Sequence, residues 1–257
     1  AYIIPLMQHA LNVNTNIKIM GSPWSAPAWM KNTTNFYSGR LKTNCYASYA
    51  KYFLKYVQSF GSNGLPIFAV TLQNEPLYEP GTYPGMRMDA TNQMEFAVLV
   101  GQQFQSNGIT TKILAYDHNW DRFDYPMAVL SNATANPYVA GSAFHAYAGD
   151  VSAQSIVHDA FTNKEIHFTE NTAGTWSGTF GQILMWDANT LLIGGMRNWS
   201  KTVIKWNLVL DQNGGPKISG GCSGCRGLVT VNTNTGAITT NADFYSMAHA
   251  SKFVKPG

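Results

Sequence analysis

Two glutamates stand where a carboxylate could take part in catalysis. Glu75 ends an apolar run and is followed by Pro76, and Glu170 ends the run Ile166–Thr169. The whole chain has only 14 acidic residues, so each one at the end of an apolar run is informative. Either glutamate alone is more often a solvated residue at the rim of a sheet. Two carboxylates facing across a pocket, one protonated and one ionised, are the groups that hydrolyse a glycosidic bond.

Residues suited to holding a sugar follow the same apolar runs. Tryptophan rings offer flat faces to a pyranose, and amide, imidazole, phenol and carboxylate groups bond its hydroxyls. The candidates are Trp24, Trp120, Trp176 and Trp206 for the rings, and Asn74, Asp117, His145, Tyr147 and Asn207 for the hydroxyls. Their alternative roles are structural, because Asp117 could cap a helix, His145 and Tyr147 could form a core pair, and Trp24 could pack inside the fold.

Other site chemistries have little support in the sequence. No His-x-x-x-His pair or carboxylate cluster has ligand spacing, so neither a metal nor another cofactor is expected. No Gly-x-Ser-x-Gly elbow and no Gly-x-Gly-x-x-Gly loop is present. The net charge is +3 and the basic residues are scattered, which argues against a nucleic-acid partner.

Six apolar runs would have to position these side chains. Several are almost continuously apolar, which is typical of strands covered on both faces. The runs are Ile17–Met20, Ile67–Leu72, Lys112–Tyr116, Val139–Phe144, Ile166–Thr169 and Val203–Leu210. Each is followed by polar or aromatic residues, as at the catalytic mouth of a parallel barrel.

Amphipathic stretches lie between these runs. The spacing of apolar residues predicts helices over Tyr46–Phe60, Thr91–Ser106, Phe180–Trp199 and Phe244–Phe253. Alternating strands and helices predict an α/β fold with a parallel sheet, and we favour a barrel over an open sheet. In a barrel of about eight strands, Glu75 and Glu170 would lie three strands apart, across the mouth.

The composition is that of an exported protein that binds neutral ligands. Charged residues make up 12% of the chain, against about 25% in an average protein. No stretch of about 18 apolar residues occurs, so no transmembrane segment is expected. If the protein is exported, we expect its leader to have been removed already. Of three cysteines, we expect Cys222 and Cys225 to form a local disulfide and Cys45 to be buried. We therefore predict an extracellular location, while the oligomeric state is left open.

Five segments, in this order, resemble glycoside hydrolase family 30. They are GSPWSAPAWMK (21–31), QNEP (73–76), FTE (168–170), WNLVLDQNGGP (206–216) and HASKFV (249–254). The resemblance implies a clan A (β/α)8 TIM barrel and a retaining mechanism. Within the family, the chain is most similar to the branch of endo-β-1,6-glucanases and glucosylceramidases.

The same resemblance implies roles for the two carboxylates. Glu75 would be the acid/base, and Glu170 would be the nucleophile that forms a covalent glycosyl-enzyme. Asn74 would bond the 2-hydroxyl of the sugar.

It also implies the surroundings of the nucleophile. Trp24 and Trp206 would line the −1 subsite, and Tyr147 with His145 would steady the carboxylate. The peptide between Trp206 and Asn207 is expected to be cis.

The resemblance also sets an expectation for domain organisation. Residues 1–257 would form one catalytic barrel domain, from the third strand to the eighth helix. The first two strand–helix units and a flanking β-sandwich would be absent. Strands at 17–20 and 203–210 would then have open edges, so we expect the partial barrel alone to be poorly soluble and inactive.

The expected activity is double-displacement hydrolysis of a β-glucan or β-glucoside. Endo-β-1,6-glucanase is the first interpretation and glucosylceramidase the second. A catalytically silent carbohydrate-binding barrel is the alternative from a different class.

Overall fold

The computed structural model describes residues 2–255 of the chain. The chain divides into two compact units, the first comprising Ala1–His118 and Asp124–Ala143, the second Asn119–Phe123 and Phe144–Gly257. Within residues 2–255, no helix combines the length and the apolar character that crossing a membrane requires.

A parallel sheet forms the centre of the first unit. Its strands are β1 (Ile19–Gly21), β2 (Ile67–Thr71), β3 (Lys112–Asn119) and the first residues of β4 (Gly141–His145). Strand β2 pairs with β1 on one side and with β3 on the other, both in the parallel sense. Ala69, Leu114 and Ala143 form a buried cluster in this sheet. The predicted strands are therefore confirmed here to within a few residues.

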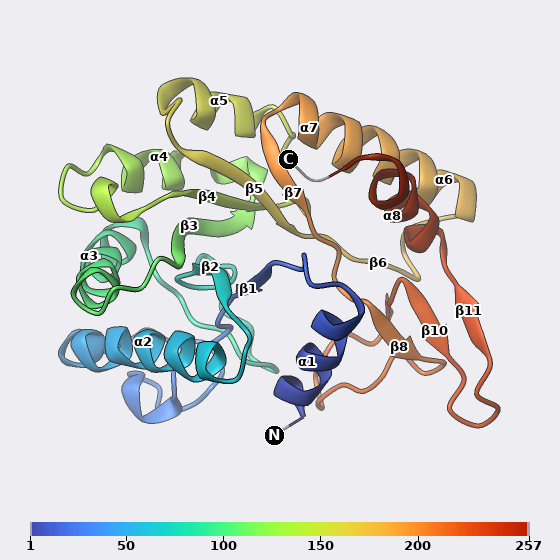
Figure 1. The fold of residues 1–257 in the computed structure, drawn as a ribbon, viewed down its shortest axis with the longest axis horizontal. Helices are drawn as coiled ribbons and strands as arrows, with labels where there is room; N and C mark the ends of the chain where they lie inside the picture. The colour runs from blue at the N-terminus through green and yellow to red at the C-terminus, as the bar shows by residue number, and fades with distance from the viewer. Residues whose placement is uncertain (1, 256–257) are drawn as a thin grey trace. The chain divides into compact units, whose positions relative to one another are not determined.

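Helices and short turns precede and follow the strands of this unit. They are α1 (Ile3–Val13), α2 (Tyr46–Ser62), α3 (Ala90–Ser106) and α4 (Asp124–Ser131), with short 3-10 turns η1 (Ala28–Met30), η2 (Thr43–Cys45) and η4 (Asn136–Tyr138). Helices α2 and α3 lie side by side (Figure 1). The ring of Tyr49 stacks on that of Phe96, with centroids 5.1 Å apart. The apolar faces that predicted these two helices are the faces that pack together.

Glycines end both helices in the way the sequence indicates. After α2, Gly64 has a φ of 76° and its N–H donates to the carbonyl of Gly61, while Leu65 N–H donates to that of Phe60. This is a Schellman ending, which needs a residue in the left-handed region, where glycine costs least. Gly108, with a φ of 64°, ends α3 in the same way.

A lysine is buried within the first unit. The Lys31 ammonium donates to Ser25 Oγ (2.9 Å) and to the carbonyls of Phe36 (2.9 Å) and Gly85 (2.8 Å). Its side chain ties the segment after β1 to the loop after β2. Burial lowers the pKa of Lys31 to about 8, and the charge of Glu79 offsets part of that effect.

The lowered pKa of Lys31 predicts a pH dependence of stability. Between pH of about 8 and the ordinary value of 10.5, the unfolded chain binds more protons at this lysine than the folded protein does. The Lys31 contribution to the free energy of unfolding should therefore rise with pH across that window. Lys31→Met should lack this rise and, at pH 7, unfold about 2–4 kcal/mol more easily, because buried carbonyls lose their donor.

Urea unfolding at several pH values measures both effects. Lys51→Met, which removes an exposed lysine on α2, is the matched control and should leave the pH profile unchanged. Identical profiles for wild type and Lys31→Met would contradict the prediction.

The second unit contains the other two strands of the predicted series. They are β5 (Glu165–Glu170) and β7 (Ser200–Val203), which pair in parallel. The prediction of one strand over Val203–Leu210 is wrong, because β7 ends at Val203. Beyond it, Trp206 N–H donates to the carbonyl of Asn171 (2.8 Å), and the chain leaves the sheet.

The strands of two small sheets escaped the sequence analysis. They are β6 (Ala173–Gly174), β8 (Val209–Asp211), β9 (Cys225–Arg226), β10 (Val229–Val231) and β11 (Ile238–Thr240). Strand β10 pairs with β8 in parallel and with β11 as a hairpin, and β6 pairs with β9. The expected disulfide between Cys222 and Cys225 is present beside β9, and Cys45 is free and buried, as expected.

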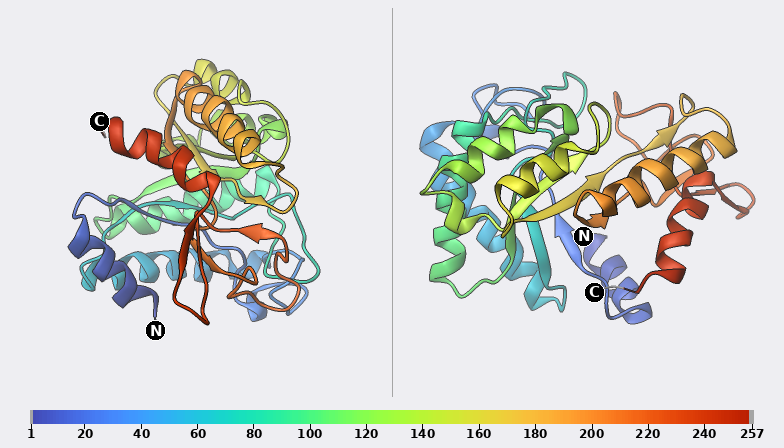
Figure 2. Two further views of the ribbon diagram at one scale, coloured as in Figure 1. Left: turned by 90° about the vertical axis from the view of Figure 1, so that its right-hand side faces the viewer. Right: turned by 90° about the horizontal axis from the view of Figure 1, so that it is seen from above.

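The helices of the second unit include an unusual segment. They are η3 (Trp120–Arg122), α5 (Ala153–Ala160), α6 (Phe180–Trp186), the π-helix η5 (Asp187–Gly194), α7 (Gly195–Arg197) and α8 (Ala242–Phe253). The predicted helix at 180–199 is thus one helical run with a π-helical centre. It begins at a capping box between Thr179 and Gln182. Helix α8 packs on α6 (Figure 2).

Candidate active site

Glu75 follows β2 at a turn with uncommon backbone geometry. Its φ is 44°, in the left-handed region, which costs a non-glycine residue about 1–3 kcal/mol. Hydrogen bonds hold it there, because Glu75 N–H donates to the carbonyl of Asp117 (2.9 Å) and Tyr78 N–H donates to the carbonyl of Glu75 (2.9 Å). The surrounding structure therefore sets the direction in which this carboxylate leaves the strand.

Asp117 has a structural role in place of the expected contact with substrate. Its side chain is 1% exposed, and its Oδ2 accepts hydrogen bonds from Ser22 Oγ (2.6 Å) and Thr71 Oγ1 (2.6 Å). The carboxylate therefore joins the ends of β1, β2 and β3. The expectation that Asp117 binds sugar is corrected here, because a carboxylate enclosed by such donors is a cross-link of the strand ends.

Asn74 and Trp24 lie on neighbouring strand ends in the first unit. Asn74 N–H donates to the carbonyl of Pro23 (2.9 Å), and Gln73 Nε2 donates to that of Trp24 (2.8 Å). The Trp24 ring lies against Tyr83, with centroids 5.7 Å apart. Both predicted residues are partly exposed, and the hydrogen bonds given above are made by their backbone groups. Their side chains are therefore available to a ligand.

His118 was missed as a functional residue. Its Nε2 lies 4.0 Å from Glu75 Oε1, and its side chain is mostly buried. The signal was present, because His118 belongs to the polar segment Asp117–Trp120 that follows the third apolar run. An imidazole beside a carboxylate can stabilise its negative charge or exchange a proton with it.

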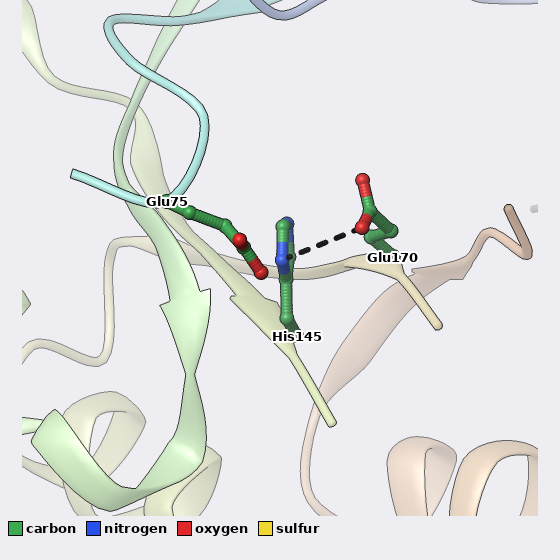
Figure 3. Close-up of side chains that lie close together, drawn as sticks. All are labelled: Glu75, His145 and Glu170. Carbon is green, nitrogen blue, oxygen red and sulfur yellow. Dashed lines mark ion pairs between the residues drawn. The ribbon is translucent and has the colours of Figure 1, made fainter. Parts of the chain in front are cut away.

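Glu170 ends β5 and is held by two aromatic side chains. Tyr147 Oη donates to Glu170 Oε1 (3.0 Å), and His145 Nδ1 lies 4.0 Å from the same oxygen. Figure 3 shows the side chains of His145 and Glu170, with this contact dashed, and that of Glu75. A hydroxyl donated to a carboxylate stabilises the negative charge that a nucleophile must carry.

The segment after β7 comes back to Glu170. Trp206 N–H donates to the carbonyl of Asn171, the residue that follows the glutamate. The Trp206–Asn207 peptide is cis, which confirms that expectation. Asn207 Oδ1 accepts from Val209 N–H (3.1 Å), so this side chain supports the turn into β8.

A buried ion network holds the segment around Asn171 and Trp206 in place. Lys205 Nζ contacts Asn171 Oδ1 (3.0 Å), Asp187 Oδ1 (2.9 Å) and Asp243 Oδ1 (2.9 Å). The side chains of Lys205, Asp187 and Asp243 are at most 3% exposed. Arg226 also contacts Asp243 (3.1 Å), so two cations balance two anions. No sequence pattern predicts this network, because its members come from separate segments between residues 171 and 243.

The predicted tryptophans differ in their surroundings. Trp120 is 3% exposed and packs on Phe168, with ring centroids 5.5 Å apart. Its expected role as a sugar platform is therefore wrong, because the ring is part of the core. Trp176 is 59% exposed.

Glu75 thus follows one parallel strand and Glu170 ends another, and residues of the same unit hold each carboxylate in place. Residues 1–254 match the family model of the glycosyl hydrolase family 30 TIM-barrel domain. The chain belongs to glycosyl hydrolase family 30. The expected (β/α)8 barrel fold is therefore confirmed.

Several known proteins are similar to this chain in sequence and in fold. An endo-1,6-β-D-glucanase of Trichoderma harzianum is 37% identical over 95% of the chain and 51% of its own length. A solved endo-β1,6-glucanase is also 37% identical, with a TM-score of 0.95 over 100% of the chain and 60% of its own length. A putative glucosylceramidase of Caenorhabditis elegans is 31% identical over 99% of the chain and 52% of its own length. The chain spans about half the length of the curated relatives it matches.

Proposed function

We propose that this chain provides the catalytic residues of a retaining endo-β-1,6-glucanase. The observation that carries the proposal is the 37% identity, over 95% of the chain, to a protein named for this activity. The putative glucosylceramidase is 31% identical, so glucosylceramide hydrolysis is the second candidate. Supporting the enzymatic role, Glu75 and Glu170 both follow parallel strands and both have supporting partners.

The mechanism follows from the two carboxylates. Glu170 attacks the anomeric carbon while Glu75 gives its proton to the leaving oxygen, and a glycosyl-enzyme forms. Glu75 then takes a proton from water, which attacks the same carbon and releases Glu170. The Tyr147 hydroxyl, 3.0 Å from Glu170 Oε1, keeps the nucleophile oriented and ionised between turnovers.

Four residues complete the proposed sugar site. Asn74 would bond the 2-hydroxyl, where hydrogen bonds strengthen as the transition state forms. Trp24 and Trp206 would line the −1 subsite, and Asn207, which follows Trp206, would bond a sugar hydroxyl. His145 supports Glu170 from the buried side, at 1% exposure.

The proposed substrate is a β-glucan or β-glucoside outside the cell, hydrolysed without a cofactor. The disulfide between Cys222 and Cys225 supports an extracellular location, because such bonds persist in oxidising compartments. A catalytically silent carbohydrate-binding barrel is the remaining alternative, and the retention of both glutamates argues against it.

A substrate panel tests the proposal. The full-length protein is incubated with β-1,6-glucan, glucosylceramide and xylan, and released sugars are measured. We expect hydrolysis of β-1,6-glucan in preference to the others. Preferential hydrolysis of glucosylceramide would select the second candidate, and binding to glucan without hydrolysis would select the silent barrel.

The geometry of the proposed pair gives a separate prediction. In a crystal structure of the full-length protein, the carboxyl groups of Glu75 and Glu170 should lie about 5–5.5 Å apart, the retaining spacing. An inverting enzyme needs about 6.5–9.5 Å to admit a water molecule. NMR of the first-formed product should accordingly show the β-anomer. A separation above about 8 Å with an α-anomeric product would contradict double displacement.

A further inference from the structure

A cavity beside the proposed nucleophile lies entirely within the second unit. Its volume is about 320 Å³, at the lower end of the usual range for small-molecule sites. Tyr147 and Asn171 form one wall, and Trp176 and Trp186 contribute aromatic surface. The Tyr147 hydroxyl donates a hydrogen bond to Glu170, and Asn171 is the residue after Glu170. The cavity is therefore lined by residues next to the catalytic carboxylate.

The Trp176 ring is exposed but firmly supported. It is 59% exposed, so a ligand can reach its face. Backbone lies directly against the ring, because a Cβ added to Gly174 or Gly224 would approach it to 2.5 Å or 3.0 Å. Both positions therefore require glycine for this close approach.

Strand pairing keeps those glycines in place. Gly174 of β6 pairs with Cys225 of β9, and Thr175 N–H donates to the carbonyl of Gly224 (2.9 Å). The disulfide from Cys222 to Cys225 closes the loop that carries Gly224. A ring held this way loses little conformational freedom when a ligand stacks on it.

The chemistry of the cavity suits a neutral sugar. Asp187 contributes to the lining, but its carboxylate is neutralised by Lys205 Nζ at 2.9 Å. Thr172 and Ser177 also line the cavity, and a hydroxyl can both donate to and accept from a sugar hydroxyl. Aromatic faces with a few hydrogen-bonding groups recognise the apolar face and the hydroxyl rim of a pyranose.

We propose that this cavity, with Trp176 as its stacking platform, binds a glucosyl residue of the substrate next to the one whose glycosidic bond is cleaved. This inference rests on the proposed function, because it names where the substrate continues. It assigns a role to the Cys222–Cys225 loop, which supports the platform from behind. It also predicts that affinity increases when the substrate is long enough to fill the cavity.

The test compares a long and a short substrate on the full-length protein. In Trp176→Ala, the ratio of kcat/KM for β-1,6-linked glucotetraose to kcat/KM for p-nitrophenyl β-glucoside should fall about tenfold, the loss of one stacking contact. Trp176→Phe should recover most of that ratio. Trp199→Ala is the matched control, because Trp199 is 53% exposed in the same unit and stacks on His158. It should leave the ratio unchanged.

A binding measurement separates recognition from turnover. In Glu170→Gln, titration with glucotetraose should quench tryptophan fluorescence, and adding Trp176→Ala should weaken the Kd about tenfold. An unchanged ratio and Kd, or an equal loss on both substrates, would overturn the subsite. Failure of the proposed function would look different, because wild type would then not hydrolyse β-1,6-glucan.

Discussion

Glu170→Ala should abolish turnover of β-1,6-glucan by the full-length protein, with kcat falling at least about 10⁴-fold. Without this carboxylate, no glycosyl-enzyme can form. The loss should be as large for an aryl glucoside with a good leaving group, because the missing step is nucleophilic attack. Added azide should yield no product with retained configuration.

The matched control for this change is on the same strand. Glu165 begins β5 and contacts Lys201 Nζ at 2.8 Å, at the opposite end from Glu170. Glu165→Gln should keep activity within a few-fold of wild type, which separates loss of the nucleophile from disturbance of the strand. Comparable losses of activity in Glu165→Gln and Glu170→Ala would contradict the assignment of Glu170 as the nucleophile.

Glu75→Ala should respond differently to the substrate. Hydrolysis of β-1,6-glucan should fall about 10²–10⁴-fold, the usual contribution of a general acid. An aryl glucoside with a good leaving group needs little proton donation, so formation of its glycosyl-enzyme should continue. Azide should then rescue turnover and give a β-glycosyl azide. Equal dependence of both variants on leaving-group acidity would show that the two roles are wrongly assigned.

Lys205→Met should destabilise the protein by about 3–5 kcal/mol, because it leaves the carboxylates of Asp187 and Asp243 buried without this cation. Asn171 and Trp206 would lose the side chain that fixes their segment. A displacement of about 1 Å near the reacting groups costs about 10²-fold in rate, so kcat should fall with stability. Urea unfolding and kinetics on the same preparations measure the two effects.

Removing the charges together provides the control. Lys205→Met combined with Asp187→Asn and Asp243→Asn should recover much of the lost stability, because the charge that remains in the network is that of Arg226, whose side chain is 29% exposed and can be solvated. Its kcat should remain low, since the position of Trp206 still lacks the lysine. Equal stability of the single and triple variants would show that charge burial is not the cause.

The repeating elements were accessible from the sequence because local patterns encode them. Apolar spacing over Tyr46–Phe60 predicted α2, and Gly64 marked its end, since both depend on contacts within a few residues. The run Val203–Leu210 misled, because apolar character does not distinguish one strand from two strands in different sheets. Trp120 misled in the same way, since a tryptophan after a strand can face the core or a ligand.

What the sequence determined by itself was the chemistry available. Scarce carboxylates at strand ends, with tryptophans nearby, indicated glycoside hydrolysis, and the resemblance of five segments indicated family 30, which the family match confirms. Only the tertiary structure decided which polar side chains build the frame. It assigned Asp117 to a buried cross-link and Lys205 to a charge network, and it exposed Trp176. These roles depend on which distant segments exclude water from a group, and no spacing along the chain carries that information.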